Sequence, residues 1–185
     1  ELLAKQYTLV ATNVPYLGRG KQVAELQRFC EANYPASQAD LAAVFVERCL
    51  RYLKDGGATA IVTKDEWFAL VSYETLRKSF LASTTIEGLC RLGARAFDGI
   101  SGERVSAGLI VLSRRRPDDG HLVAGIDASS ARPIAAKAEA LRTNTLVTIS
   151  QSALRAQPGA AITLDPIDSL RTLARYATCY QGTST

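Results

Sequence analysis

Residues 7–22 of the chain read YTLVATNVPYLGRGKQ. The apolar, β-branched run over residues 7–12 is typical of a buried strand. Four residues of a different kind follow it directly, and they are Asn13, Val14, Pro15 and Tyr16. An amide, a proline and an aromatic residue at this place cap no helix and form no tight hairpin. We therefore predict that the strand ends at a binding pocket.

Composition and charge place the chain among ordinary globular proteins. Its 185 residues are enough for one core, or for one core with a small appendage. A net charge of +4 is compatible with an anionic partner. No apolar run reaches the length of a membrane span, and no signal peptide is visible. Because the chain begins with Glu1 and contains no methionine, we expect it to be a piece of a longer protein.

The cysteines and the histidine argue against a metal centre. Cys30, Cys49, Cys90 and Cys179 are widely spaced, and His121 is the only histidine. Zinc sites need closer pairs of such ligands, so we predict no metal site. This cysteine usage fits a reduced, cytoplasmic compartment.

Apolar periodicity predicts an α/β protein. The predicted strands are 7–12, 58–64, 85–93 and 104–115, and the predicted helices are 22–33, 37–57 and 72–82. In the second helix Ser37 and Asp40 have capping-box spacing, and Gly56 and Gly57 end it. The third and fourth strands lie close enough in the sequence to form an antiparallel pair.

The polar stretch RRRPDDGH, residues 114–121, predicts a boundary. We assign residues 1–116 to one unit and 117–185 to a small α+β unit. In the second unit we expect strands near 121–127, 145–150 and 160–164, and helices over 131–143 and from Asp165 onward. The basic cluster at 114–116 is read as solvated surface in preference to a phosphate site.

Three stretches of the chain resemble a known family. Asn13, Val14, Pro15 and Tyr16 resemble the (N/D/S)PP(Y/F) motif of amino-methyltransferases that use S-adenosylmethionine. Residues 39–81, which contain DLAAVF, LKDGG and AIVTKDEW, resemble the stretch that follows this motif in adenine-specific DNA methyltransferases. Residues 92–112 resemble the last strands of the same domain. The group with the greatest likeness is the PglX-like methyltransferases of BREX phage-defence systems and their relatives in restriction-modification systems.

The resemblance implies a fold and a reaction. The fold would be the C-terminal half of a Rossmann-like class I methyltransferase domain, a mixed sheet with an antiparallel last strand, followed by a connector toward a target-recognition region. In this half-domain the first three predicted strands would be parallel, and the fourth would run antiparallel between two of them. The first strand would then form an edge of the sheet. The reaction would move a methyl group from S-adenosylmethionine to the N6 amine of an adenine flipped out of double-stranded DNA. The glycine-rich motif that binds most of this cofactor would lie upstream of the fragment, which would be inactive alone. Other restriction or defence subunits are possible partners.

The resemblance also implies roles for single residues. The Asn13 side chain and the Val14 carbonyl would accept the two N–H bonds of the adenine amine, which localises its lone pair. Tyr16 would stack on the base, with Phe97 on the opposite face. Pro15 completes the catalytic motif and, with Asn13 and Phe45, would contact the cofactor.

The loop after the motif is a candidate DNA contact. Its glycines allow a close approach to the DNA backbone, and Arg19 and Lys21 could hold phosphates.

Other functions stay open. Val14 stands where the family has a proline. This difference leaves open the hypothesis that the chain is a weakly active or inactive scaffold module of a defence complex. The same motif also serves enzymes that methylate RNA bases or protein glutamine. A cytosine ring-carbon methyltransferase is disfavoured, because the chain has no Pro-Cys dipeptide that could supply the nucleophile.

Overall fold

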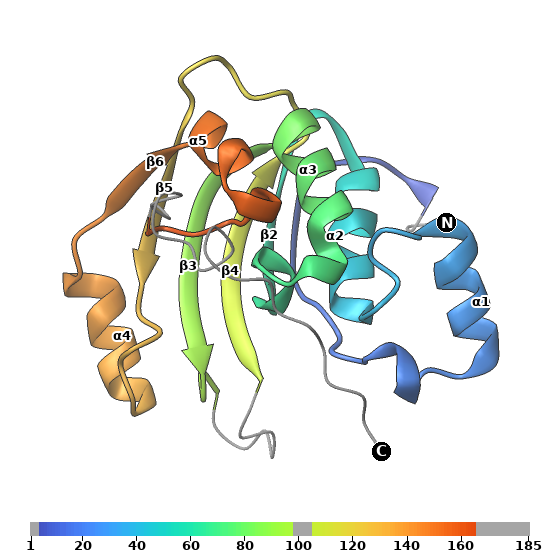
Figure 1. Cartoon of the computed structure of the whole chain (residues 1–185), viewed down its shortest axis with the longest axis horizontal. Coiled ribbons are helices and arrows are strands. Elements are labelled where there is room, and N and C mark those ends of the chain that lie inside the picture. The colour runs from blue at the N-terminus through green and yellow to red at the C-terminus, as the bar shows by residue number, and fades with distance from the viewer. Residues whose placement is uncertain (1–3, 98–104, 166–185) are drawn as a thin grey trace, which may run out of the picture.

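A computed structural model describes residues 4–97 and 105–165, and its centre is a single mixed sheet (Figure 1). The strand order in this sheet is β1-β2-β4-β3-β5-β6. The strands are β1 (Tyr7–Asn13), β2 (Leu53–Lys64), β3 (Thr85–Ala94), β4 (Ser106–Ser113), β5 (Leu122–Asp127) and β6 (Val147–Ser150).

The pairing of the strands confirms the predicted topology. β1 pairs parallel with β2, and β4 runs antiparallel between β2 and β3. The first strand lies at an edge of the sheet, as expected. β5 pairs parallel with β3, and β6 pairs antiparallel with β5.

In the view of Figure 1, α3 and α5 lie in front of the sheet, and α2 packs on β2 toward the β1 edge. The helices are α1 (Ala24–Asn33), α2 (Leu41–Arg51), α3 (Glu74–Ser83), α4 (Ile134–Thr143) and α5 (Gln151–Ala156). In the part of the chain that the structure describes, no helix has the length and apolar character that a membrane span requires.

The core lies between these helices and one face of the sheet. Ile61, Ile110 and Leu89 stand side by side on β2, β4 and β3, and each is almost fully buried. The rings of Trp67 and Phe68 meet edge to face above the sheet, with their centroids 4.7 Å apart. In a strand, neighbouring residues point to opposite faces of the sheet. The neighbours of Ile61, Ile110 and Leu89 on their strands therefore point away from the helices and are less buried.

The opposite face of the sheet is open to solvent at β1 and β4. Leu9 is 64% exposed and Val111 is 36% exposed, although both are large apolar residues. The prediction that the first strand is buried is therefore wrong for the described chain. An edge strand whose outer face has no cover exposes its side chains even when the sequence is apolar.

The predicted helix over 37–57 is wrong at both ends. Asp40, not Ser37, is the N-cap, and its carboxylate accepts a hydrogen bond of 2.8 Å from the Ala42 N–H. The helix ends at Arg51, and β2 begins at Leu53, before the two glycines. Gly56 has φ +75° inside β2, where the register with β1 shifts, so the glycines mark a bulge and not a helix end.

Residues 121–150 form the strand, helix and strand that the sequence predicts, whereas residues 160–164 form no strand. Ala160 ends a short 3-10 helix, Pro158–Ala160, and in the irregular segment that follows the Ile162 N–H donates to the Phe68 carbonyl over 2.8 Å. The helix expected from Asp165 onward falls outside the described residues.

The predicted boundary after residue 116 does not coincide with a break in the sheet, because β5 pairs directly with β3. The side chain of Gln151 adds a second connection. It accepts from the Ile86 N–H and donates to the carbonyls of Leu81 and Thr84, all within 3.1 Å. The division into two units remains a prediction.

Candidate active site

The carboxyl ends of four parallel strands meet at one edge of the sheet, the lower edge in Figure 1. They bring together Asn13 of β1, Lys64 of β2, Arg91 of β3 and Asp127 of β5. In open α/β sheets, ligands bind in crevices outside such ends. This edge is therefore the first place to look for a site.

Asn13 and Val14 present two unused hydrogen-bond acceptors at this edge. The Val14 N–H donates to the Val62 carbonyl over 3.1 Å, and the Val14 side chain is only 4% exposed. The main chain is thus fixed at this point, while Asn13 and Pro15 are exposed. Among the described residues, nothing hydrogen-bonds to the Asn13 side chain or to the Val14 carbonyl oxygen. Both oxygens are free to accept hydrogen bonds from a ligand.

Tyr16 lies half-buried beside these residues. Its hydroxyl is buried and has no hydrogen-bond partner among the described residues. Burial raises the pKa of the Tyr16 phenol; the Lys64 charge lowers it, and the carboxylates of Asp40 and Asp65 raise it further. The phenol is therefore neutral at physiological pH.

Tyr16 also lines a pocket of about 550 Å³. The walls come from the loop after β1, the start of α2, the end of β2 and the residue before β4. The lining residues are Tyr16, Gly18, Arg19, Gly20, Lys21, Ala39, Asp40, Lys64 and Val105. The pocket thus joins the predicted base-stacking residue to both predicted phosphate contacts.

The loop that carries Arg19 and Lys21 is held against α2. The Leu41 N–H donates to the Leu17 carbonyl over 3.0 Å, and the Arg19 N–H donates to the Ala39 carbonyl over 2.9 Å. The Arg19 guanidinium forms an ion pair with Glu31, whereas Lys21 is exposed. Lys21 is therefore the more accessible of the two predicted phosphate contacts.

A partly buried ion pair, which the sequence did not reveal, closes the pocket. The Lys64 Nζ lies 3.0 Å from Asp40 Oδ2 and 3.0 Å from Glu66 Oε2. Burial lowers the pKa of Lys64, but its hydrogen bonds to the two carboxylates outweigh that effect and raise the pKa overall. The only signal in the sequence was the capping position of Asp40, which gives no hint of a partner so far along the chain.

Further along the edge, Arg91 joins two carboxylates. It lies 3.9 Å from Asp65 and 3.4 Å from Asp127, and the Ser106 hydroxyl donates to Asp65 over 2.8 Å. These contacts link the ends of β2, β3 and β5 to the start of β4.

Neither of the two predicted phenylalanines is among the residues that line the pocket. Phe45 is half-buried on α2 and packs against the main core. Phe97 is 39% exposed in the loop after β3 and is not among the residues that line the pocket. Val105, near the other end of that loop, lines it instead.

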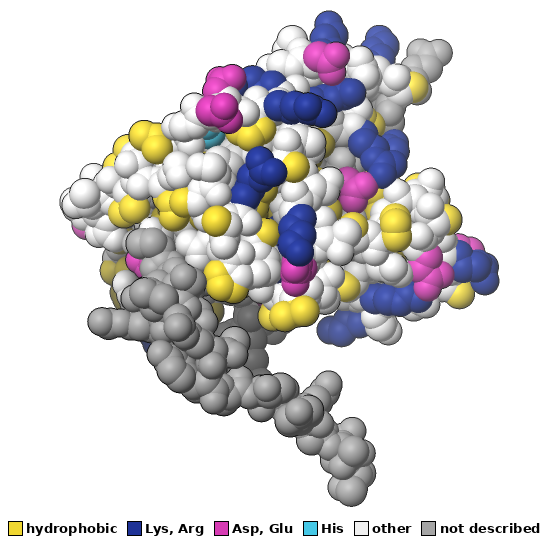
Figure 2. Space-filling view, turned by 45° about the horizontal axis from the view of Figure 1, so that its top comes forward, with side chains coloured by type: hydrophobic (Ala, Val, Ile, Leu, Met, Phe, Trp, Pro, Cys, Tyr) yellow, Lys and Arg dark blue, Asp and Glu magenta, His cyan; other side chains and the backbone are white. Residues whose placement is uncertain are grey.

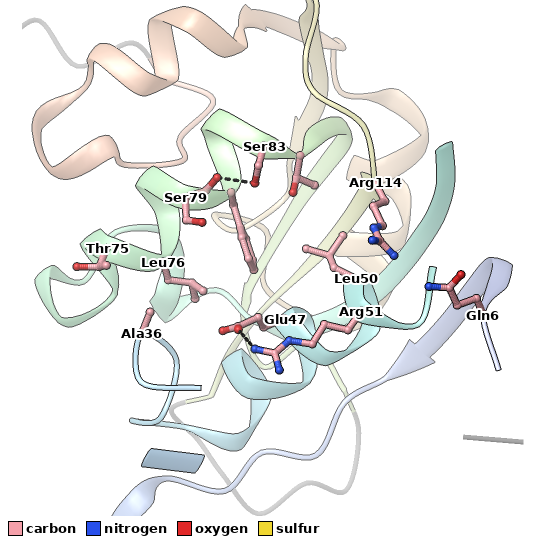
Figure 3. Close-up of a pocket in the computed structure, with 12 residues that line it drawn as sticks. Gln6, Ala36, Glu47, Leu50, Arg51, Thr75, Leu76, Ser79, Ser83 and Arg114 are labelled. Carbon is pink, nitrogen blue, oxygen red and sulfur yellow. Dashed lines mark hydrogen bonds and ion pairs between the residues drawn. The ribbon is translucent and has the colours of Figure 1, made fainter. Parts of the chain in front are cut away.

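A second hollow, of about 570 Å³, lies between α2 and α3 (Figure 3). Leu50, Leu76 and Phe80 are among the apolar residues of its lining, and Glu47 and Arg51 form an ion pair of 2.6 Å beside them. Gln6 and Arg114, which also line it, belong to the opposite edge of the sheet. This hollow is therefore separate from the strand-end pocket.

The basic cluster at residues 114–116 also lies at that opposite edge. Basic and acidic side chains are interspersed there in Figure 2. Arg114 pairs with Asp55 over 3.4 Å, and Arg115 pairs with Glu87 over 3.1 Å. Arg114 and Arg115 are therefore remote from the strand-end pocket, and each has a carboxylate partner.

Known proteins resemble this chain in sequence. Residues 2–97 match the family model described as Eco57I restriction-modification methylase. The chain is 40% identical over 114 residues to the adenine-specific methyltransferase PglX of Lacticaseibacillus casei (strain Zhang), a match that covers 62% of the chain and 9% of that relative. The chain thus spans only a small part of that protein.

Solved structures share the fold. A chain of a type I restriction-modification system superposes with a TM-score of 0.67 at 13% identity, covering 94% of this chain and 41% of that one. The methyltransferase subunit of a type I system from Streptococcus thermophilus gives a TM-score of 0.57 at 18% identity, covering 81% and 36%. These likenesses confirm the predicted fold class, the mixed sheet of a Rossmann-like methyltransferase domain.

Proposed function

Because the chain belongs to the Eco57I restriction-modification methylase family, we propose that it is part of an adenine-specific DNA methyltransferase. The reaction moves a methyl group from S-adenosylmethionine to the N6 amine of an adenine that has left the double helix. The name of the 40% identical relative supports adenine as the substrate base. Double-stranded DNA is then the partner, together with other subunits of a restriction-modification or BREX-type system, in the cytoplasm.

The observation that carries this proposal is the pair of free acceptors at the end of β1. The adenine amine is a poor nucleophile because its lone pair is delocalised into the ring. The Asn13 oxygen and the Val14 carbonyl accept its two N–H bonds and favour a pyramidal nitrogen with a localised lone pair. Acceptors that are already fixed cost no reorganisation when the charge develops.

Val14 in place of the family proline is compatible with this role. Every residue has a carbonyl, and the hydrogen bond from the Val14 N–H to Val62 fixes the main chain there. The buried valine side chain adds a second constraint. The rigidity lost with the proline ring is thereby partly restored, which favours an active enzyme over a scaffold module.

Base capture falls to the aromatic residues. An enzyme that acts on a base inside a duplex must flip it out, and stacking offsets the cost of unpairing. Tyr16 stacks on one face of the base, and Phe97 stacks on the other. Lys21, and Arg19 once released from Glu31, hold the flanking phosphates.

Three described residues are the candidates for one side of an S-adenosylmethionine site. Asn13 and Pro15 are exposed at the edge strand, and Phe45 is partly accessible on α2. These three residues would hold the cofactor, which supplies an electrophilic methyl group when bound. The outer edge of β1 and the open face beside it leave room for further contacts from the longer protein that we expect to carry this chain.

Single-turnover methylation of a cognate duplex by that longer protein tests the proposal. Replacing Asn13 by Ala removes one fixed acceptor, and we expect the rate to fall by about 10²–10³. Asn33→Ala, an exposed asparagine on α1, is the matched control and should retain the rate. If Asn13→Ala also retains it, the strand end is only a turn and the scaffold hypothesis is preferred.

A further inference from the structure

The Lys64–Asp40 ion pair is more deeply buried than a surface pair. The Lys64 and Asp40 side chains are 16% and 8% exposed, and their charged atoms are 3.0 Å apart. Removing two charges from water costs several kcal/mol per ion, and their attraction often fails to recover it. Stability alone is therefore a weak reason for this pair, and a role in the geometry of the site is a stronger one.

Asp40 connects three elements at the pocket. Its carboxylate caps α2 by accepting from the Ala42 N–H over 2.8 Å and binds Lys64 at the end of β2. Its main chain forms a β-bridge with Gly18, in the loop that follows Tyr16. The position of this loop is thus tied to the ion pair.

Tyr16 lies where these constraints meet. It lines the same pocket as Asp40 and Lys64, and the bridged Gly18 follows it by two positions. Because its buried hydroxyl has no hydrogen-bond partner among the described residues, no bond of its own fixes the ring. The orientation of the ring therefore depends on the packing of the loop.

We propose that Lys64 and Asp40 are positioning residues that hold Tyr16 in place to stack on the flipped adenine. This inference rests on the proposed function. Neither residue touches the reacting atoms. Lys64 acts through Asp40, and Asp40 acts through the loop that carries Tyr16.

A direct phosphate contact by Lys64 is the competing role. The structure disfavours it, because the ammonium already lies 3.0 Å from each of two carboxylates. A phosphate ligand contributes about one unit to the slope of log affinity against log salt. Lys64→Met should leave this slope unchanged if the residue only positions Tyr16.

A double-mutant cycle in the longer methyltransferase tests the inference. The variants are Lys64→Met, Tyr16→Ala and the two combined, assayed by single-turnover methylation and by fluorescence of 2-aminopurine at the target position. We expect Lys64→Met to slow methylation about tenfold when Tyr16 is present and less than about twofold when it is absent. The 2-aminopurine signal at saturating DNA should change in the same pattern.

Three further variants separate positioning from folding. The double variant Asp40→Asn/Lys64→Met removes both charges of the pair and keeps a good N-cap, so it should fold normally. It should nevertheless lose the part of the methylation rate that depends on Tyr16. Lys64→Arg should restore most of that rate. Lys78→Met, which breaks an exposed ion pair with Glu74 on α3, should have no effect on rate or fluorescence.

The outcomes distinguish the two hypotheses. The positioning role is overturned if the effects of Lys64→Met and Tyr16→Ala are additive, or if the salt slope of Lys64→Met falls by about one unit. The proposed function is not affected by either result. If Tyr16→Ala changes neither the rate nor the 2-aminopurine signal, base stacking by Tyr16 is wrong, and the proposed function loses that part.

Discussion

The sheet has one face that the helices cover and one that is open, and the two are built from different residues. On the covered face, Ile61 and Ile110 are no more than 2% exposed. On the open face, β1 and β4 expose Leu9 and Val111. Ala58, Ala60 and Val62 of β2 lie on the same face and are only partly exposed. The open face is thus apolar, and solvent reaches it mainly at β1.

This difference bears on the candidate site, because strand alternation places Asn13 on the open face, in line with Leu9. The free acceptor of the site therefore borders the surface that the described residues leave uncovered. The longer length of the relatives is consistent with further segments against this face. The four predictions below test the contrast between the faces.

The largest expected effect is the loss of a side chain from the covered face. Ile110→Ala leaves a cavity between Ile61 and Leu89, and we expect the free energy of unfolding to fall by about 2–5 kcal/mol. Val111→Ala, one residue away on the open face, should cost about 1 kcal/mol or less. Urea denaturation of both variants measures the difference, and equal losses would remove the distinction between the faces.

The second prediction concerns the pH dependence of the free energy of unfolding. It depends on how well the covered side of the sheet shields Tyr73 from water. Burial, together with Asp40 and Glu66, raises the pKa of Tyr73 to about 12, although Lys64 lowers it. An unfolded phenol ionises near pH 10, so the folded protein holds this proton more tightly. Stability should be unaffected below about pH 10 and should fall by about 2–3 kcal/mol between pH 10 and 12.

The measurement compares the wild-type protein with Tyr73→Phe. The wild type should lose more stability than the variant across that pH range, because the variant has no phenol to ionise. Parallel losses would mean that Tyr73 is hydrated in the folded state.

Alanine substitutions at two glycines should change the stability by smaller amounts and in opposite directions. A Cβ on Gly108 would lie 2.8 Å from Cε2 of Phe68 on the covered face, and we expect Gly108→Ala to cost about 1–3 kcal/mol. A Cβ on Gly88 meets nothing closer than the Ala124 carbonyl, at 3.8 Å. Gly88→Ala should stabilise the protein by about 0.4–1 kcal/mol. Thermal unfolding of the two variants reports the sign directly.

The smallest effect is expected at the open edge. Leu9→Lys should change the stability of this chain by no more than about 0.5 kcal/mol, since the leucine is already 64% exposed. In the longer protein the same change should cost more, provided that other segments cover the face. An equal and small effect in both proteins would show that the open face stays open.

The arrangement of the first four strands was predicted, whereas the addition of β5 and β6 to the same sheet was not. The runs that became β1, β2, β3 and β4 are strongly apolar, and the family resemblance supplied their arrangement. Sequence reasoning failed at Gly56 and Gly57, because two glycines after a helical pattern resemble a helix end, whereas the bulge arises from pairing with β1. It also failed at residues 160–164, where an apolar segment packs on the core without a strand partner.

The candidate site was predictable to a similar extent. The motif at Asn13 and its neighbours is local, so the sequence alone located it. The pairing of Lys64 with Asp40 is not local, because 24 residues separate them and only the fold brings them together. Phe97 is likewise distant in sequence from Tyr16, and only the fold decides whether the two lie near each other.

The position of β4 has a consequence for the synthesis of the protein. β4 lies between β2 and β3 but is made after both of them. On the ribosome, synthesis of β2 is complete at Lys64, whereas its neighbour β4 is complete only at Ser113. At translation rates of about 5–20 residues per second, that delay is roughly 2–10 s. During this time two apolar strands have unpaired edges that other nascent chains could join. A translational pause before Ser113 would prolong this exposure, whereas rapid translation of the segment would shorten it.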